Sequence, residues 1–223
     1  SNLVDELVRL GHQVLVIDNL SNGKRENVNR KAKFYKFDIT NLKQIQPIFR
    51  RVDYVFHLAA LPRVQFSIEN PLESDAVNVR GTLNVLVASA NAGVKRVIYS
   101  ASSSAYGDQK IMPLRESFLA NPKSPYGLQK YIGELYCKIF QEIYGLKTVS
   151  LRYFNVYGPR QPREGAYTPV IGIFLTQKAQ GKPLSFSGDG GQTGDFTHVS
   201  DVVGANILAM ESEIVCKGEL INV

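Results

Sequence analysis

Short apolar runs alternate with segments of helical periodicity along most of this chain. The runs QVLVIDN, KFYKFDI, DYVFHLA, KRVIYSAS and KTVSLRYF are rich in Val, Ile, Tyr and Phe, which favours strands. Between them, apolar residues recur at helical spacing, as at Val79, Leu83, Leu86 and Ala90 ahead of Gly93. Apolar strands that alternate with helices predict an α/β fold, with a doubly wound parallel sheet covered on both faces.

The pattern changes after residue 157. Pro and Gly crowd residues 158–194, which indicates a less regular, substrate-facing portion. The last residues, GELINV, have the pattern of one more strand. We therefore expect a regular α/β unit over residues 1–157 and a smaller, partial substrate-facing region over residues 158–223.

Composition places the chain among ordinary globular proteins, with 44% hydrophobic and 21% charged residues. No apolar run approaches the roughly 18 residues that a membrane span needs, so we expect no membrane partner. The two cysteines, Cys137 and Cys216, are too few for a disulfide framework. A reducing, cytoplasmic location is the simplest expectation.

Nearly all of the net charge of +6 lies in residues 24–36, which hold six basic side chains and one acidic one. A nucleic-acid surface would interleave basic residues with stacking aromatics or a reading helix, and neither pattern occurs here. We therefore expect no nucleic-acid partner. The segment has the character of a solvated loop that also faces an anionic cofactor.

Asp18 closes the first apolar run and is the first residue with candidate chemistry. An acidic side chain at the carboxyl end of such a strand can bind the adenosine ribose hydroxyls of NAD and repel a 2′-phosphate. The alternative is a turn aspartate, because the following DNLSNG is typical of any loop. The glycine-rich phosphate turn that would decide between them is expected just before Ser1, outside this chain.

Two Tyr-x-x-x-Lys pairs, Tyr106/Lys110 and Tyr126/Lys130, could place a phenol and an ammonium on one helix face. Gly107 and Asp108 break the helical geometry of the first pair, so we expect Tyr106 to pack and Lys110 to be solvated. Tyr126 follows Ser-Pro, a helix-start signal, and leads into apolar residues at helical period. The second pair is therefore the candidate for acid–base chemistry.

Hydroxyl groups gather in SASSSAYG, residues 100–107, directly after the strand RVIY. The carboxyl end of a parallel strand faces the ligand crevice in open α/β sheets, so Ser100 and Ser102 are candidate ligand contacts. Without the Tyr126/Lys130 pair, a serine-rich turn would explain this run equally well.

The sequence resembles the extended short-chain dehydrogenase/reductases in three blocks that occur in the same order: SASSSAYG, SPYGLQKYIGE and LRYFNVYGPRQ. Within that group, it is most similar to the UDP-glucose and UDP-N-acetylglucosamine 4-epimerases of the NAD-dependent epimerase/dehydratase family. The similarity spans essentially the whole chain. It implies a Rossmann-like fold, NAD as cofactor and a nucleotide-diphosphate sugar as substrate. It also implies that the family's first strand and glycine-rich turn, and its C-terminal part, are missing from this chain.

The resemblance assigns roles by matching position. Catalysis falls to Ser102, Tyr126 and Lys130, with Tyr126 as acid/base and Lys130 holding the nicotinamide ribose and lowering the tyrosine pKa. The implied cofactor contacts are Asp18, Asn19, Asn22, Gly23, Asp38, Ile39, Leu58, Ala59, Ala60, Asn78, Ser100, Tyr126, Lys130 and Phe154. The implied substrate contacts are Ser102, Tyr126, Asn155, Val170 and Ser185, and no metal is expected.

The implied reaction is epimerisation at C4′ through a bound 4-ketose, with hydride passing to NAD and returning to the other face. The related 4,6-dehydratases and decarboxylases place a carboxylate just before the YG of the strand-end motif. This chain has Ser103, Ser104 and Ala105 there, so it lacks that acid.

Gly194 departs from the family pattern, because an arginine that pairs with the substrate diphosphate usually stands there, and Gly172 replaces a common proline. Two alternatives therefore stay open: a non-catalytic nucleotide-sugar or dinucleotide binder, or another epimerase or reductase of the same family. The resemblance also implies a homodimer formed through the segments around residues 76–92 and 124–143.

Overall fold

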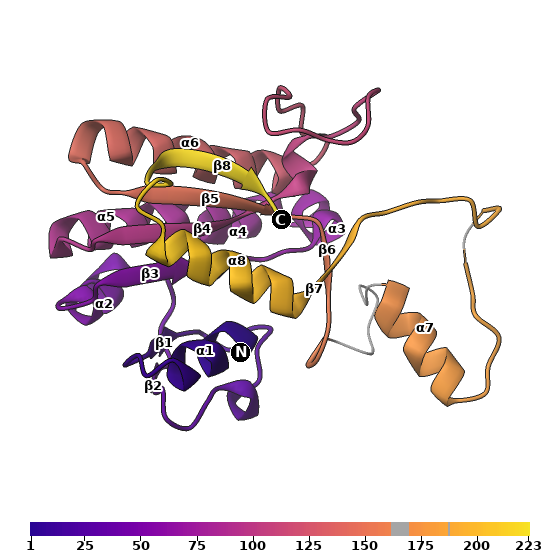
Figure 1. The fold of residues 1–223 in the computed structure, drawn as a ribbon, viewed down its shortest axis with the longest axis horizontal. Helices are drawn as coiled ribbons and strands as arrows, with labels where there is room; N and C mark the ends of the chain where they lie inside the picture. Colours follow the sequence, from indigo (N-terminus) through magenta and orange to yellow (C-terminus); the bar gives the residue numbers. More distant parts are fainter. Residues whose placement is uncertain (162–169, 187) are drawn as a thin grey trace.

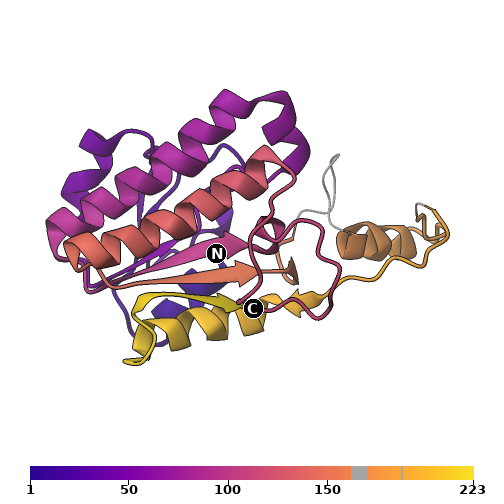
Figure 2. The same cartoon turned by 90° about the horizontal axis from the view of Figure 1, so that it is seen from above.

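A computed structural model describes residues 1–161, 170–186 and 188–223. Parallel strands form the centre of the molecule, and helices cover both faces (Figures 1 and 2). The central strands are β1 (Leu15–Ile17), β2 (Lys33–Tyr35), β3 (Tyr54–His57), β4 (Arg96–Ser102), β5 (Thr148–Tyr153) and β8 (Lys217–Asn222). The predicted doubly wound α/β class is confirmed, and every apolar run singled out in the sequence forms one of these strands.

The central strands form two separate sheets. β1 pairs with β2, and the second sheet has the order β3-β4-β5-β8, all parallel. The interruption lies between β1 and β3. In the classic doubly wound order 3-2-1-4-5-6, the first strand takes this central position. The observed order therefore agrees with the expectation of a sheet without its first strand.

Two apolar cores occupy the two faces of the sheet. On one face, Val97 and Tyr99 of β4 pack against α5 (Thr82–Ala92) and α6 (Pro125–Tyr144). On the other face, Ile98 packs with α1 (Asn2–Arg9) and α8 (Val199–Glu211). Alternate residues of one strand thus serve opposite cores, which is why the strands appear in sequence as nearly continuous apolar runs.

The helix ends follow their sequence signals. The Ser124 hydroxyl accepts a hydrogen bond from the Gly127 N–H at 3.1 Å, Pro125 takes the first turn of α6, and Gly145 ends the helix in the left-handed conformation. Gly93 ends α5 in the same conformation, with φ of 69°. The N-cap fixes where α6 begins and therefore where Tyr126 lies.

Several short helices lack a clear sequence signal. They are α2 (Leu42–Ile45), α3 (Val64–Glu69), α4 (Pro71–Asp75) and a π-helical segment, Ala76–Gly81, that runs into α5. Each of the three α-helices is too short to show an amphipathic period, so tertiary contacts decide its conformation. Of these, α3, α4 and the π-helical segment connect the end of β3 to the start of α5, whereas α2 lies between β2 and β3.

Residues beyond 157 divide between two places. β6 (Asn155–Tyr157) pairs with β7 (Phe196–His198), and α7 (Val170–Ala179) projects away from the sheet (Figure 1). The chain then returns, because α8 covers one face and β8 pairs with β5. The division of the chain at residue 157 into a cofactor-binding and a substrate-binding part stays a prediction. Structurally, part of the segment 158–223 belongs to the main sheet, because β8 is one of its strands.

Both cysteines are free, with Cys137 buried and Cys216 partly buried. Within the described residues, no helix has the length and apolar character to cross a membrane.

Two helix glycines provide a matched test of the packing. A Cβ at Gly133 of α6 would overlap the phenol oxygen of buried Tyr99, whereas a Cβ at Gly204 of α8 meets nothing within 4 Å. Gly133→Ala should therefore destabilise the protein by roughly 1–3 kcal/mol. Gly204→Ala should stabilise it by roughly 0.5–1 kcal/mol, because alanine favours the helix. Urea unfolding of both variants checks the prediction, and equal shifts would contradict the packing of α6 on β4.

Candidate active site

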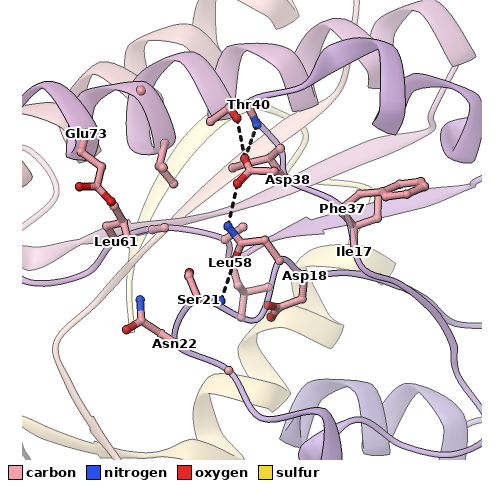
Figure 3. A pocket seen from close by; sticks show the side chains of 17 residues that line it. Ile17, Asp18, Ser21, Asn22, Phe37, Asp38, Thr40, Leu58, Leu61 and Glu73 are labelled. Carbon is pink, nitrogen blue, oxygen red and sulfur yellow. Dashed lines mark hydrogen bonds between the residues drawn. The ribbon is translucent and has the colours of Figure 1, made fainter.

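The carboxyl ends of β1, β2 and β3 surround a cavity of about 400 Å³ (Figure 3). Parallel strands place their carboxyl ends at one edge of a sheet, where open α/β folds bind ligands. The first nine of the predicted cofactor residues line this cavity: Asp18, Asn19, Asn22, Gly23, Asp38, Ile39, Leu58, Ala59 and Ala60. They come from three separate stretches of sequence, and the fold brings them together.

Asp18 combines both roles that the sequence left open. Its Oδ1 accepts a hydrogen bond from the Leu20 N–H at 2.6 Å, which is the contact of a turn aspartate. The same side chain lines the cavity, and a Cβ at Gly23 would lie only 3.3 Å from its Oδ2. Glycine at position 23 therefore keeps the second carboxylate oxygen accessible to a ligand.

Asp38 is held rigidly at the end of β2. Its Oδ1 accepts hydrogen bonds from the N–H and the hydroxyl of Thr40 at 2.8 and 2.7 Å, and its Oδ2 accepts one from Asn19 at 2.7 Å (Figure 3). Burial acts to raise the pKa of Asp38, but these hydrogen bonds outweigh it and the net pKa lies below its ordinary value. Asn19 thus ties the loop after β1 to the loop after β2.

Sequence reasoning missed eight further residues that line the cavity: Ile17, Ser21, Phe37, Thr40, Leu61, Glu73, Ala76 and Val77. Most are immediate neighbours of predicted residues, so extending each strand-end motif by a residue or two would have found them. Glu73 is different, because it reaches the cavity from α4 (Figure 3). No signal in the sequence announced that this short helix lies beside the cofactor loops.

A second group forms where α6 packs on the end of β4. Ser102 and Tyr126 are both buried, and the Ser102 side chain lies close enough to the Tyr126 phenol to act on its pKa. The ammonium of buried Lys130 donates a hydrogen bond to the Ser100 carbonyl oxygen at 2.8 Å and lies 5.1 Å from the centre of the Tyr99 ring. The fold therefore brings the three predicted catalytic residues to one junction of a helix and a strand.

The pKa of Tyr126 differs from the expectation that Lys130 lowers it. Burial raises the pKa of the phenol above its ordinary value, and the hydrogen bond from Ser102 opposes this shift only in part. The Lys130 ammonium is directed to the Ser100 carbonyl oxygen. Burial lowers the pKa of Lys130 itself to about 8, although the nearby Glu134 carboxylate acts to raise it.

The other predicted cofactor residues have structural partners. Asn78 is 1% exposed, and its amide exchanges two hydrogen bonds with the backbone of Leu61. The Ser100 hydroxyl donates to the Tyr153 phenol oxygen at 3.2 Å. Phe154 is partly buried at the end of β5, beside the same strand edge. None of the three lines the cavity, and their contact with a cofactor stays a prediction.

The predicted substrate residues lie farther along the chain. Asn155 is exposed, and its amide donates to the Asp195 carbonyl oxygen at 2.8 Å. A Cβ at Gly194 would lie 3.4 Å from that amide nitrogen, so these two positions are neighbours. Val170 begins α7, and Ser185 accepts a hydrogen bond from Gln177 of the same helix at 2.6 Å. The structure does not bring Val170 and Ser185 to the Ser102–Tyr126 pair.

Tyr106 and Lys110 behave as predicted for the pair without function. Tyr106 is fully buried, its phenol donates to the Asn222 Oδ1 at 2.7 Å, and the Arg152 guanidinium stacks on its ring at 4.1 Å. Lys110 is exposed. Among the described residues, no group of three His, Cys, Asp or Glu side chains is arranged to hold a metal ion.

Comparisons with known proteins agree on one family. Residues 1–223 match the family model described as NAD dependent epimerase/dehydratase family. The structure is similar to a UDP-glucose 4-epimerase of Thermotoga maritima solved with UDP-glucose (TM-score 0.94, 42% identity, 100% of this chain and 72% of that one). It is equally similar to a UDP-N-acetylglucosamine 4-epimerase of Methanobrevibacter ruminantium (TM-score 0.94, 42% identity, 99% and 71% covered). A UDP-N-acetyl-alpha-D-glucosaminuronate decarboxylase of Bacillus cytotoxicus is 36% identical, with 100% of this chain and 70% of that protein covered.

The pKa of Lys130 provides a test of the site. Between pH 8 and 10.5, Lys130 is neutral in the folded protein and protonated in the unfolded chain, so unfolding takes up a proton. Stability should therefore rise with pH across this window relative to Lys130→Met, by about 1.4 kcal/mol per pH unit at the steepest point. Below pH 8, both states are protonated and the difference should be constant.

Urea unfolding at a series of pH values measures this difference. Lys138→Met, an exposed lysine on the same helix, is the control and should show no such trend. A flat difference for Lys130→Met would show that the ammonium is not buried as described.

Proposed function

Since the chain belongs to the NAD dependent epimerase/dehydratase family, whose members act on nucleotide sugars, we propose that it inverts C4′ of a UDP-linked hexose. The substrates would be the UDP-glucose/UDP-galactose pair or its N-acetylated counterpart. The observation that carries the proposal is the buried pair of Ser102 and Tyr126 at the junction of β4 and α6, with Lys130 one helical turn further along α6.

The cavity at the ends of β1, β2 and β3 suits NAD, the cofactor of this family. Asp18 keeps one carboxylate oxygen free of the turn, which is the chemistry that a ribose diol requires. Asp38 is fixed by hydrogen bonds, and the apolar side chains of Ile39 and Leu58 line the same cavity, as an adenine requires. NAD, when bound, supplies the capacity to accept a hydride and return it.

Tyr126 is the proposed acid–base group. As a phenolate it would accept the proton of the sugar 4′-hydroxyl, and as a phenol it would return that proton when the centre has inverted. Ser102, buried beside the phenol, would orient the same hydroxyl. Burial alone keeps the pKa of Tyr126 high, so the phenolate needs a nearby cation, and Lys130 is charged at neutral pH with its pKa of about 8.

On the substrate side, Asn155, Val170 and Ser185 are the proposed nucleotide and diphosphate contacts. The open backbone at Gly194 leaves room beside the Asn155 amide. A substrate phosphate could approach that amide closely, although no arginine stands at position 194.

Epimerisation is favoured over dehydration or decarboxylation by the turn after β4. Ser103, Ser104 and Ala105 form this turn, and Ala105 is fully buried. The turn holds no carboxylate, and the resemblance places the dehydratase acid at this point. A decarboxylase is nevertheless as similar in overall sequence as some epimerases, so the turn residues carry more weight than overall identity.

Tyr126→Phe tests the mechanism. The variant should lose epimerase activity by roughly 10²- to 10⁴-fold, because it removes the acid–base group. NAD binding should be nearly unchanged. The assay incubates the full-length protein with UDP-galactose or UDP-N-acetylgalactosamine and measures the epimer formed.

Tyr106→Phe is the matched control, because it removes the phenol of the other Tyr-x-x-x-Lys pair. It should retain activity within a few-fold of the wild type. Undiminished activity in Tyr126→Phe would overturn the mechanism. No epimer from either substrate in the wild type, despite bound NAD, would instead support the non-catalytic binder.

A homodimer through α6 is part of the proposal. Leu128, Leu135, Ile139 and Ile143 recur on one face of this helix, and all four are at least 42% exposed. An apolar stripe of this spacing suits packing against the same helix of a second copy. α5, the other segment implied by the resemblance, presents no exposed side chain between Thr82 and Ala90.

The doubly substituted variant Leu135→Asp/Ile139→Asp should therefore be monomeric, because it puts two charges into this stripe. Size-exclusion chromatography with light scattering measures the mass. Ile214→Asp is the control, because Ile214 is 88% exposed in the loop between α8 and β8, outside the α6 stripe, and should leave the dimer intact. A wild type that is monomeric at micromolar concentration would contradict the dimer.

A further inference from the structure

Gln129 lies between Tyr126 and Lys130 in sequence, yet its side chain forms hydrogen bonds with two other residues, Ser74 and Asn78. It is 4% exposed, and no role in cofactor or substrate binding falls to it, since it does not line the cavity. Its Nε2 donates to the Ser74 hydroxyl of α4 at 2.9 Å, and its Oε1 accepts from the Asn78 amide at 2.9 Å. A buried amide with both ends engaged is costly to leave unpaired, so its contacts define a fixed geometry.

Asn78 extends this contact to the wall of the cofactor cavity. Its Oδ1 accepts from the Leu61 N–H at 2.8 Å, and its Nδ2 donates to the Leu61 carbonyl oxygen at 3.1 Å as well as to Gln129. Both hydrogens of the Asn78 amide are thus used, and they set the orientation of the Gln129 amide. Leu61 and the three residues before it line the cavity.

The same stretch of chain holds the first turn of α6 at a second point. The Ser67 hydroxyl of α3 accepts a hydrogen bond from the Tyr126 N–H at 3.0 Å, and Ser67 and Ser74 are both fully buried. The Asn78 segment is π-helical, a conformation that is often found at functional sites. In this segment, the Asn78 side chain forms hydrogen bonds with both Leu61 and Gln129.

We propose that Gln129 is a positioning residue that couples the cavity loop Leu58–Leu61, through Asn78, to the turn of α6 that carries Tyr126 and Lys130. This inference rests on the proposed function, because it gives those two residues their roles. A ligand that fills the cavity beside the loop Leu58–Leu61 then favours one orientation of the first turn of α6. Both ends of each amide are paired, which makes this coupling rigid, because neither side chain can turn without losing a hydrogen bond.

ADP is the probe that tests the coupling. It corresponds to the adenine half of NAD, and the cavity that would hold it has no lining residue from α6. In the wild type, ADP should slow amide hydrogen exchange both at Leu58–Leu61 and in the first turn of α6. In Gln129→Leu, protection should persist at the loop and disappear from the α6 turn, and ADP should bind roughly fivefold to tenfold more weakly.

Gln141→Leu makes the same substitution on the same helix outside this network, and it should behave as the wild type. Ser74→Ala is a milder second variant should Gln129→Leu not fold. It frees one end of the Gln129 amide and should lose part of the α6 protection. An α6 turn that stays protected by ADP in both variants would overturn the coupling.

Kinetics of the full-length protein provide a second readout. Gln129→Leu should lower kcat by roughly 10- to 100-fold, with KM for the nucleotide sugar within about threefold, because misplacement of the base affects the chemical step. The pH dependence of kcat should shift as well, which a merely structural defect would not cause. Unchanged kcat and pH profile would contradict the role. A wild type that forms no epimer would refute the proposed function, whereas the ADP exchange experiment would still decide the coupling.

Discussion

The hydrogen bond from the Lys130 ammonium to the Ser100 carbonyl oxygen fixes α6 on the end of β4, and the geometry of the site depends on it. A buried lysine needs such a partner, because an unpaired ammonium inside the protein is costly. With this contact in place, the Ser102 hydroxyl meets the Tyr126 phenol across the same junction. The buried ion pair of Glu134 with Arg152, at 2.6 Å, holds the next turn of α6 against β5. These contacts together fix the position of α6 along β4 and β5.

The sequence predicted the parts of the fold that have a period or a cap. The strands appear as apolar runs because both faces are buried, and α6 begins at Ser124 because its hydroxyl caps the helix. The sequence could not show α3, α4 or the π-helical segment, whose conformation depends on contacts with residues far along the chain, such as Ser67 with Tyr126 and Asn78 with Gln129. Glu73 and Gln129 were missed for the same reason.

For the site, the sequence separated the two Tyr-x-x-x-Lys pairs correctly by their turn residues, since Tyr106 packs under Arg152 and Lys110 is exposed. It could not show where the Lys130 ammonium is directed, and the action of Lys130 on the phenol stays a prediction. Spacing alone suggests that the Lys130 charge acts on Tyr126, but the direction of a four-carbon side chain depends on its nearest acceptor. That acceptor is a backbone carbonyl of β4, which no pattern of residue types reveals.

The cavity draws its lining from two sheets that share no strand pairing in the described residues. The loops after β1 and β2 supply Asp18 and Asp38, while Leu58 and Ala59 follow β3 of the other sheet. A ligand that spans the cavity therefore bridges the two sheets and stabilises the folded protein by mass action. Resistance of the β1–β2 segment to proteolysis would then report on cofactor occupancy.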